Sequence, residues 1–329
     1  RLHTLARRLV LEGKRVVGVE IEDAQGQVKR LQASEVVLSA GAYNTPPLLE
    51  LSGIGDPKVL QGLGIDVCHP LGGVGASLQD HLQLWVQQGV KTRQTLSEDG
   101  KFPRVVWSVL RYLATRKGPL AFPAASVGAF VSTTPGERPI FQLHFTPGAG
   151  AMDEHGRMVA SPEPGVNSTV CVIRPTSRGT VHAADNDPRT PPRILHNYLS
   201  TEHDRTLSIE GFRLQRRIYA AEPFARYATH ELNPGPEVQS DDEILDFWRR
   251  EAMSVYHPVG SARMGAADDP GAVVDHELRV HGLEGVRVVD ASIFPQIPSG
   301  NTHAPVVAVA ERAADLILGR PLLPPDSDM

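Results

Sequence analysis

Cysteine is scarce in this chain, with only Cys68 and Cys171 among 329 residues. Two cysteines exclude a disulfide framework and a zinc site built on cysteine ligands. The 13 histidines show no H-x-x-x-H or H-x-x-E-H spacing, so a metal hydrolase has little support and we predict no metal. This cysteine usage fits a reducing, cytoplasmic compartment.

Positive charge is not in excess, because 33 Lys and Arg residues face 38 Asp and Glu residues, a net charge of -5. A protein that binds nucleic acid through its charge would show the opposite balance. No apolar stretch approaches the roughly 20 residues of a membrane span, and the N-terminus lacks the order of a signal peptide. We therefore predict small-molecule partners, no nucleic acid and no transmembrane segment. Peripheral association with a membrane stays open.

Nucleotide-binding and nucleophile fingerprints are also missing. The chain contains no G-x-G-x-x-G, no Walker sequence and no G-x-S-x-G, and Gly260–Gly265 has the wrong spacing for the last of these. The chain begins at Arg1 without an initiator methionine and enters strand-like sequence at 15–22 and 27–33. We interpret this start as the middle of a domain. The hydrophobic content of 41% supports a full core, in two domains or in one with an insertion.

The most informative segment is the C-terminal tenth, from Val286 to Gly319. It predicts a short buried strand ending at Asp290, a loop marked by Pro and Gly, and a long helix with Asn301–His303 at its start. The N–H groups and dipole of a helix N-terminus attract negative charge, as in sites for nucleotide cofactors. An ordinary connection between a strand and a helix explains the same pattern, and both interpretations remain open.

A second strand-to-helix turn lies near the N-terminus. An apolar strand at 35–39 runs into Gly41 and Ala42, whose small side chains let a ligand approach the backbone. We expect Thr45 to cap a short helix that begins at Pro46. A purely structural turn is the alternative.

The middle of the chain changes character. From Leu84 to Asn233, short alternating segments separated by Pro and Gly predict an antiparallel sheet. Two capped helices follow, one from Thr201 and one from Ser240. Pro258 then disfavours a helical conformation for His257, which places this imidazole on a turn beside a glycine-rich loop. His257 is either a hydrogen-bonded structural residue or a catalytic one.

Three separated stretches resemble the glucose-methanol-choline family of flavin-dependent alcohol oxidoreductases, particularly its choline-dehydrogenase-like bacterial branch. They are GAYNTPPLLELSGIG from Gly41, YHPVGSARMG from Tyr256, and VVDASIFPQIPSGNTHAPVVAVAERAADLI from Val288. The connecting sequence, including LGGVGASLQDH and RPTSRGTVHAADNDP, is similar to the family as well.

The resemblance implies a mixed α+β and α/β fold. An incomplete FAD-binding domain of the p-hydroxybenzoate-hydroxylase type, formed by residues 1–83 and 254–329, is expected to carry a substrate-binding domain at 84–253 with an antiparallel sheet and helices. The family's G-x-G-x-x-G segment is expected upstream of Arg1, so we expect this chain to be the C-terminal part of a longer enzyme.

The resemblance also implies oxidation of an alcohol to an aldehyde or ketone, with hydride passing to flavin N5. Positions that match the family's motifs assign His257 as the base and His303 as its partner or an alternative base. A neutral imidazole suits this task near pH 7. The residues expected to contact the FAD are Gly41, Ala42, Asp290, Ala291, Thr302, Ala304 and Pro305.

Two departures from the family limit the prediction. Many choline-type relatives have Asn where this chain has His303, and Thr-Cys where it has Ser261-Ala262. An aromatic content of 5% gives no obvious recess for a quaternary ammonium group, so the alcohol and the electron acceptor are not identified. Because the fingerprint is missing, a non-catalytic module that binds no flavin is the alternative.

Overall fold

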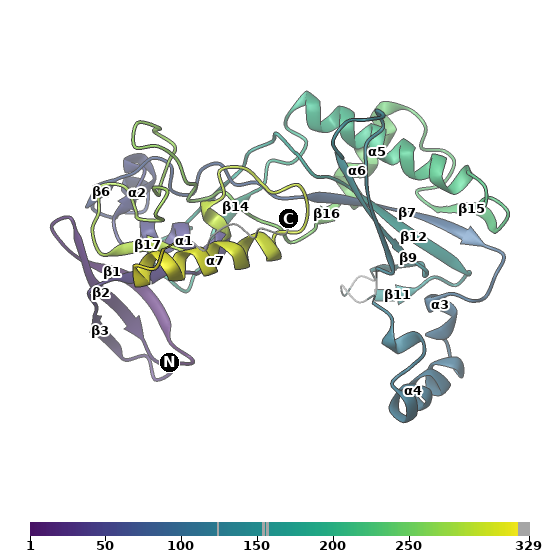
Figure 1. Ribbon diagram of the computed structural model, residues 1–329, viewed down its shortest axis with the longest axis horizontal. Coiled ribbons are helices and arrows are strands. Elements are labelled where there is room, and N and C mark those ends of the chain that lie inside the picture. The colour runs from purple at the N-terminus through teal and green to yellow at the C-terminus, as the bar shows by residue number, and fades with distance from the viewer. Residues whose placement is uncertain (124, 153–154, 156–157, 322–329) are drawn as a thin grey trace. The chain divides into compact units, whose positions relative to one another are not determined.

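The computed structural model describes residues 1–123, 125–152, 155 and 158–321 (Figure 1). The chain divides into two compact units. Unit 1 contains residues 1–80, 175–200 and the chain from 256 onwards, and unit 2 contains 81–174 and 201–255. The stretch 175–200, which we predicted within a domain at 84–253, therefore groups with unit 1.

Unit 1 contains two sheets that involve the N-terminal strands. The strands β1 (Leu5–Glu12), β2 (Arg15–Glu22) and β3 (Val28–Gln32) form an antiparallel meander. The strand β17 (Val286–Val288) pairs in parallel with β4 (Val36–Leu38), as apolar strands at these places had indicated. The two ends of the chain thus build unit 1 together.

The remaining elements of unit 1 are short, apart from the last helix. They are α1 (Gly41–Glu50), β5 (Ile54–Gly55), α2 (Pro57–Gly62), β6 (His69–Pro70), β13 (Thr180–His182), β14 (Arg193–Leu195), the 3₁₀ helix η2 (Ala291–Ile293) and α7 (His303–Leu318). The hydrophobic core of unit 1 is aliphatic. Val16 of β2, Leu49 of α1 and Val288 of β17 are fully buried in it, and α7 contributes Ala313. Burial of such side chains is the main stabilising contribution to the unit.

The start of α1 differs from our expectation. The helix begins at Gly41, and Thr45 lies inside it instead of capping it. The reason is that the Thr45 hydroxyl donates a hydrogen bond of 2.6 Å to Asp290, which also accepts the N–H of Gly41. A carboxylate from the other end of the chain therefore stabilises the helix N-terminus, where we had expected a local cap.

Unit 2 is built on a six-stranded sheet with the order β15-β7-β12-β9-β8, and β16 also pairs with β7 (Figure 1). Every pairing in this sheet is antiparallel, which confirms the predicted sheet type. The strands are β7 (Leu82–Val90), β8 (Val127–Val131), β9 (Phe141–Thr146), β12 (Gly165–Val172), β15 (Ala228–Asn233) and β16 (Met253–Ser254), and β10 (Gly150–Met152) pairs with β11 (Met158–Ala160) nearby.

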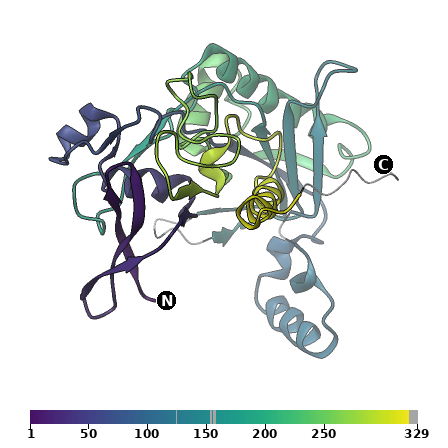
Figure 2. The ribbon, with the colours of Figure 1, turned by 60° about the vertical axis from the view of Figure 1, so that its left-hand side comes forward.

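The helices α5 (Glu202–Ala220) and α6 (Asp241–Glu251) pack against this sheet (Figure 2). Their predicted N-caps are confirmed, because Thr201 accepts from the N–H of Asp204 and Ser240 forms a capping box with Glu243. Three further helical segments occupy a region that we predicted as strands and turns: α3 (Leu96–Asp99), α4 (Arg104–Thr115) and the 3₁₀ helix η1 (Pro119–Ala121).

Gly211 marks the closest approach of α5 to the sheet. A Cβ at this position would lie 3.0 Å from both Phe141 and Val170. We expect Gly211→Val to destabilise unit 2 by about 2 kcal/mol or more, because the two core side chains would have to move. Urea unfolding checks this, with Arg217→Val on the exposed side of the same helix as the matched control. Equal stability of the two variants would contradict the packing argument.

Candidate active site

His257 lies on a tight turn in unit 1. The strand β16 precedes it, Tyr256 has a positive φ of 63° and Pro258 follows, so the backbone at His257 is held out of a helical conformation. After the turn, the backbones of Val259 and Gln79 exchange two hydrogen bonds of 2.9 Å. The imidazole is 7% exposed. The predicted turn at His257 is confirmed. The backbone hydrogen bonds between Val259 and Gln79 hold the residues that follow this turn.

Gly260 explains why the loop after His257 is rich in glycine. Its φ is +84°, and a Cβ would lie 2.7 Å from the carbonyl oxygen of Ser77. Only glycine fits such an approach without displacing the backbone.

Asp80 fixes the backbone of His257. One carboxylate oxygen of Asp80 accepts the N–H of His257 at 2.9 Å, and the other accepts the hydroxyl of Tyr198 at 2.5 Å. The ring of His196 stacks on Tyr198 at 4.8 Å, and its Nε2 lies 2.8 Å from the hydroxyl of Tyr43. Asp80 is only 4% exposed. A buried carboxylate with several partners holds its neighbours in one arrangement.

None of these supporting residues stood out in the sequence. Asp80 lies near the end of the stretch LGGVGASLQDH, and neither Asp80 nor His196 was given a function. Tyr198 belongs to the stretch that we had assigned to the other domain. Only the return of residues 175–200 to unit 1 brings Tyr198 to Asp80.

Burial sets the charge states around Asp80. It raises the pKa of Tyr43 to about 12, with a further contribution from the negative charge of Asp80. Burial also lowers the pKa of His196 below its usual value, although the attraction of Asp80 opposes this shift. Both groups are therefore neutral near pH 7 and act as hydrogen-bonding groups.

The lowered pKa of His196 predicts a pH dependence of stability. Because the folded protein binds this proton less readily than the unfolded chain, the contribution of His196 is complete above about pH 6.5 and is lost as the pH falls from there to the folded pKa. When the pH is lowered from 7.5 to 5.5, the free energy of unfolding, measured with urea, should fall less for His196→Gln than for the wild type. The exposed His276 provides the control, and an equal effect of His276→Gln would contradict the prediction.

Asn301 contacts the reactive edge of His257. The amide nitrogen of Asn301 lies 3.3 Å from Nε2 of His257. With the amide as donor, Nε2 accepts, and the neutral ring carries its proton on Nδ1. We had placed Asn301 at the start of the last helix without giving it a role. Because Nε2 of His257 has one lone pair, a substrate hydroxyl that gives its proton to Nε2 would take the place of the Asn301 amide.

His303 is the first residue of α7, and its side chain is exposed. Thr302 before it is buried but forms no side-chain cap on the helix. Ala304 and Pro305 follow in the first turn, and Pro305 has no N–H to satisfy. The three residues predicted to line a flavin thus lie at an uncapped helix N-terminus in the same unit as His257.

Asp290 and Gly41 are brought into direct contact. One carboxylate oxygen of Asp290 accepts from the N–H of Gly41 and the hydroxyl of Thr45, at 2.9 and 2.6 Å. The other oxygen accepts from the N–H and the hydroxyl of Ser292, at 2.8 and 2.5 Å. The side chain that we predicted to contact the cofactor therefore joins β17 and η2 to α1. Ala291 lies at the start of η2, partly exposed beside it.

Ala42 is buried, and its carbonyl oxygen lacks the usual hydrogen-bond donor of a helix. In a helix this oxygen would accept from the residue four positions later, but that residue is Pro46 and has no N–H. The hydroxyl of Ser261 donates to it instead, at 2.6 Å. Ser261 belongs to the glycine-rich loop after His257, so this bond connects α1 to that loop.

The residues around α1 leave room for a bound group. Gly41 has a φ of +81°, and a Cβ at Gly41 would meet no atom within 4 Å. Open space beside an exposed backbone turn at a helix N-terminus fits a phosphate or ribityl group, so the residues present are compatible with the predicted FAD. In the described ranges, no group of three or more His, Cys, Asp or Glu side chains could hold a metal. In those ranges no helix is long and apolar enough to cross a membrane.

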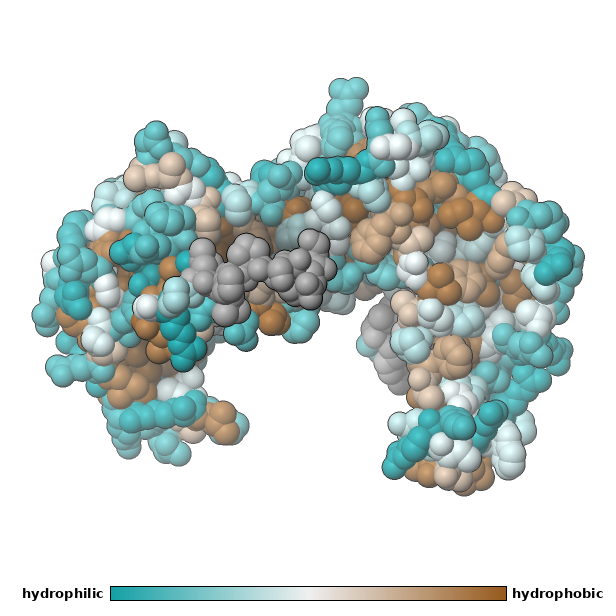
Figure 3. Space-filling model, in the orientation of Figure 1, coloured by the Kyte–Doolittle hydropathy of each residue, from teal (hydrophilic) through white to brown (hydrophobic). Residues whose placement is uncertain are grey.

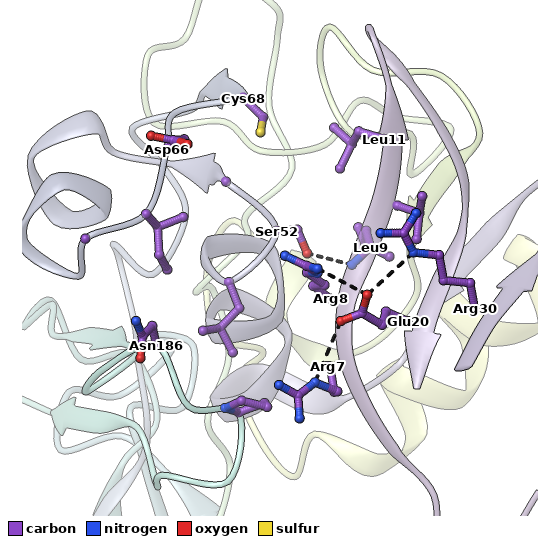
Figure 4. A pocket seen from close by; sticks show the side chains of 16 residues that line it. Arg7, Arg8, Leu9, Leu11, Glu20, Arg30, Ser52, Asp66, Cys68 and Asn186 are labelled. Atoms are coloured by element: carbon purple, nitrogen blue, oxygen red, sulfur yellow. Dashed lines mark hydrogen bonds and ion pairs between the residues drawn. The ribbon is translucent and has the colours of Figure 1, made fainter. Parts of the chain in front are cut away.

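A separate pocket of about 610 Å³ lies in unit 1 between β1 and the segments around residues 51–68 and 186–188 (Figure 4). Arg7, Arg8 and Arg30 line it, and each forms an ion pair with Glu20. Burial of Glu20 favours its neutral form, but Arg8 and Arg30 outweigh this and lower its pKa. Because the charged groups satisfy one another, we place no chemistry in this pocket.

Comparison with known proteins agrees with this geometry. Two family models match the chain, over residues 2–83 and 175–310, and both are described as GMC oxidoreductase. The chain belongs to the GMC oxidoreductase family. The matched ranges include His257, Asn301 and the residues around Asp290, so the GMC assignment rests on the segments that form the site.

Individual relatives support the assignment and show its extent. The chain is 41% identical over 316 residues to a protein named oxygen-dependent choline dehydrogenase from Staphylococcus aureus, which covers 95% of this chain and 55% of that relative. The chain therefore spans about half the length of that curated relative.

Two solved structures resemble this GMC chain over nearly all of its length. A formate oxidase from Aspergillus oryzae matches with a TM-score of 0.88 and 27% identity, covering 96% of this chain and 60% of that one. A pyridoxine 4-oxidase from Mesorbium loti matches with a TM-score of 0.82 and 29% identity, covering 97% of this chain and 58% of that one. The partial α/β fold with its antiparallel sheet is thus that of the GMC oxidoreductases.

Proposed function

We propose that this chain is the catalytic C-terminal part of an FAD-dependent enzyme that oxidises an alcohol CH–OH group to an aldehyde or ketone. The observation that carries the proposal is the buried imidazole of His257, whose Nε2 accepts from Asn301 and whose backbone is held by Asp80. FAD, when bound, supplies the acceptor for the hydride of the alcohol carbon.

His257 removes the hydroxyl proton. Loss of hydride from an alcohol carbon is difficult while the oxygen keeps its proton, and a positioned base typically accelerates such a step by about 10²- to 10⁴-fold. The anchored turn supports this role, because a base must stay within hydrogen-bonding distance of the hydroxyl. Asn301 donates toward the same place and orients the substrate oxygen.

His303 remains our proposed second imidazole. It lies two residues after Asn301, at the N-terminus of α7. The imidazole of His303 provides a further hydrogen bond to the substrate or an alternative base. Because Asn301 already contacts Nε2 of His257, the two side chains have different tasks: Asn301 orients and His303 assists.

The cofactor is held by two backbone turns and one helix start. Gly41 and Ala42 offer the open turn at α1, and Ala291 lies beside it, with the carboxylate of Asp290 fixing both segments. The first turn of α7, with Thr302, Ala304 and Pro305, would hold the flavin at an uncapped helix N-terminus, which favours a group that gains negative charge. Unit 1 is accordingly the FAD-binding part, and unit 2, with its antiparallel sheet, is the substrate-binding part.

The substrate is a small alcohol. The relatives are named for choline, formate and pyridoxine, which differ widely in charge and shape. These names identify no common substrate, so the proposal commits only to a hydroxyl at His257, with the rest of the substrate recognised elsewhere. The electron acceptor stays open between oxygen and other carriers.

To test the function, the chain is produced together with the N-terminal portion of a full-length GMC relative, and bound flavin is measured by its absorbance. The complex is then mixed without oxygen with a panel of primary alcohols, choline and pyridoxine included. We expect bleaching of the flavin absorbance by at least one alcohol. A flavin-loaded complex that no alcohol reduces would contradict the proposal.

The alternative is an interaction module that binds no flavin. It is favoured by the absence of a G-x-G-x-x-G sequence from residues 1–329. The same absorbance measurement separates the two: about one equivalent of bound FAD rules out the module, and no binding in the complex supports it.

A further inference from the structure

The segment from Lys101 to Phe122 in unit 2 combines exposed apolar side chains with positive charge. It contains α4 and η1, with five Lys and Arg residues and no Asp or Glu. Both ribbon views show α4 extending beyond α3, away from the six-stranded sheet (Figures 1 and 2). The whole chain carries a net charge of -5, so this basic composition is local.

The apolar face of α4 points to solvent. Val105, Ser108 and Tyr112 are its least exposed residues, and their spacing of three and four places them on the inner face. The outer face carries four large apolar side chains, of which Trp107 is 70% and Leu113 62% exposed. These four residues are Val106, Trp107, Leu110 and Leu113. A surface helix normally has the opposite arrangement, with its apolar side inward.

Aromatic side chains continue this face at both ends. Phe102 precedes α4 and is 84% exposed, and Phe122 follows η1 and is 64% exposed. In the space-filling view, hydrophobic residues lie beside hydrophilic ones at this end of unit 2 (Figure 3). Several large apolar side chains exposed within one short segment favour an interaction surface.

The cations lie along the border of the apolar face. Arg104 and Arg111 are seven residues apart and therefore share one side of α4, and Arg116 and Lys117 follow its last turn. All four are exposed. Lys101 is paired with Glu98, and the same carboxylate also attracts Arg104. Arg104 donates to a carbonyl oxygen and Arg116 lies over the ring of Tyr112, so five cations share the one acidic side chain of Glu98.

We propose that α4 and its flanking residues bind the surface of a membrane that contains anionic lipids. A helix of 12 residues is too short to span a bilayer but long enough to lie in its interface, with apolar side chains inserted and cations at the headgroups. Each basic residue near an anionic surface adds to the attraction. A second copy of this chain is a poorer occupant, because a symmetric contact would bring two sets of like charges together.

Vesicle flotation of the purified chain tests the proposal. We expect the chain to float with vesicles of phosphatidylcholine and phosphatidylglycerol, and to stay behind with phosphatidylcholine alone. High salt should weaken the binding, because it screens the lipid charge. Insertion of Trp107 should shift the tryptophan fluorescence to the blue, and Trp107→Phe should remove this shift.

Two variants separate the contribution of the apolar side chains to membrane binding from that of the cations. Trp107→Ser with Leu110→Ser should abolish flotation, and neutralising Arg111, Arg116 and Lys117 with glutamine should weaken it about 100-fold. The matched control is Ile218→Ser, at an exposed apolar position on α5 of the same unit. Flotation that is equal on neutral vesicles, or unaffected by both variants, would overturn the proposal. So would a dimer in gel filtration that both variants dissociate, because the face then binds a second copy.

Discussion

Replacing His257 with alanine is expected to lower kcat for alcohol oxidation by about 10²- to 10⁴-fold in the flavin-loaded complex. The side chain is buried and its backbone is held by Asp80, so no neighbouring group can move into its place without breaking the turn. The decisive measurement is the rate of flavin bleaching by alcohol without oxygen, which isolates the reductive half of the reaction. Flavin content should stay unchanged.

The pH dependence sharpens this experiment. If His257 acts as the base, the bleaching rate of the wild type falls as the imidazole is protonated, and the residual rate of the alanine variant loses that dependence. His276→Ala, at an exposed position on a loop, is the matched control for loss of an imidazole. An alanine variant of His257 that keeps the wild-type rate and pH profile would remove His257 from the reaction.

Asp290→Ala is expected to lower the stability of unit 1 strongly, by about 3 to 5 kcal/mol of unfolding free energy. The carboxylate is buried and accepts four hydrogen bonds, from Gly41, Thr45 and Ser292. Removing it leaves donors without a partner at the start of α1, and each buried unsatisfied group costs about 1 to 3 kcal/mol. Urea unfolding of the chain measures the difference.

Two further variants make this result specific. Asp290→Asn keeps the shape of the side chain, but its amide NH₂ group cannot accept hydrogen bonds. The unfolding free energy of this variant should therefore lie between those of the wild type and Asp290→Ala. Asp268→Ala removes an exposed carboxylate from a nearby loop and should change the unfolding free energy by less than about 0.5 kcal/mol. If Asp290→Ala were no more destabilising than Asp268→Ala, the carboxylate would not hold the segments together.

Local patterns predicted the elements well where the cause is local. The turn at His257 follows from Pro258, and the caps at Thr201 and Ser240 follow from their own side chains. The start of α1 could not be predicted in this way. Its cap, Asp290, lies 249 residues from Gly41, and Thr45 donates to that carboxylate instead of capping a helix.

The supporting residues of the site were hidden for the same reason. Asp80 and Asn301 lie in stretches that resemble the family, but nothing local to them shows that both contact His257. Tyr198 reaches Asp80 because the fold brings residues 175–200 back to unit 1. The helix α4 was hidden by its exposed apolar face, since a run of Val, Trp and Leu near Pro and Gly equally fits a buried strand. The assignments of His303 and the flavin contacts remain predictions.

The parallel pair of β4 and β17 has a consequence for how the chain folds during synthesis. Residues 36–38 leave the ribosome long before residues 286–288, so β4 waits without its partner until about 250 further residues have been made. Unit 2 ends at Val255, so its sheet can close while unit 1 is still incomplete. Contacts so distant in sequence fold slowly. The N-terminal meander can pair from its own neighbouring strands, whereas β4 is the strand of the nascent chain that stays open to wrong pairing until β17 arrives.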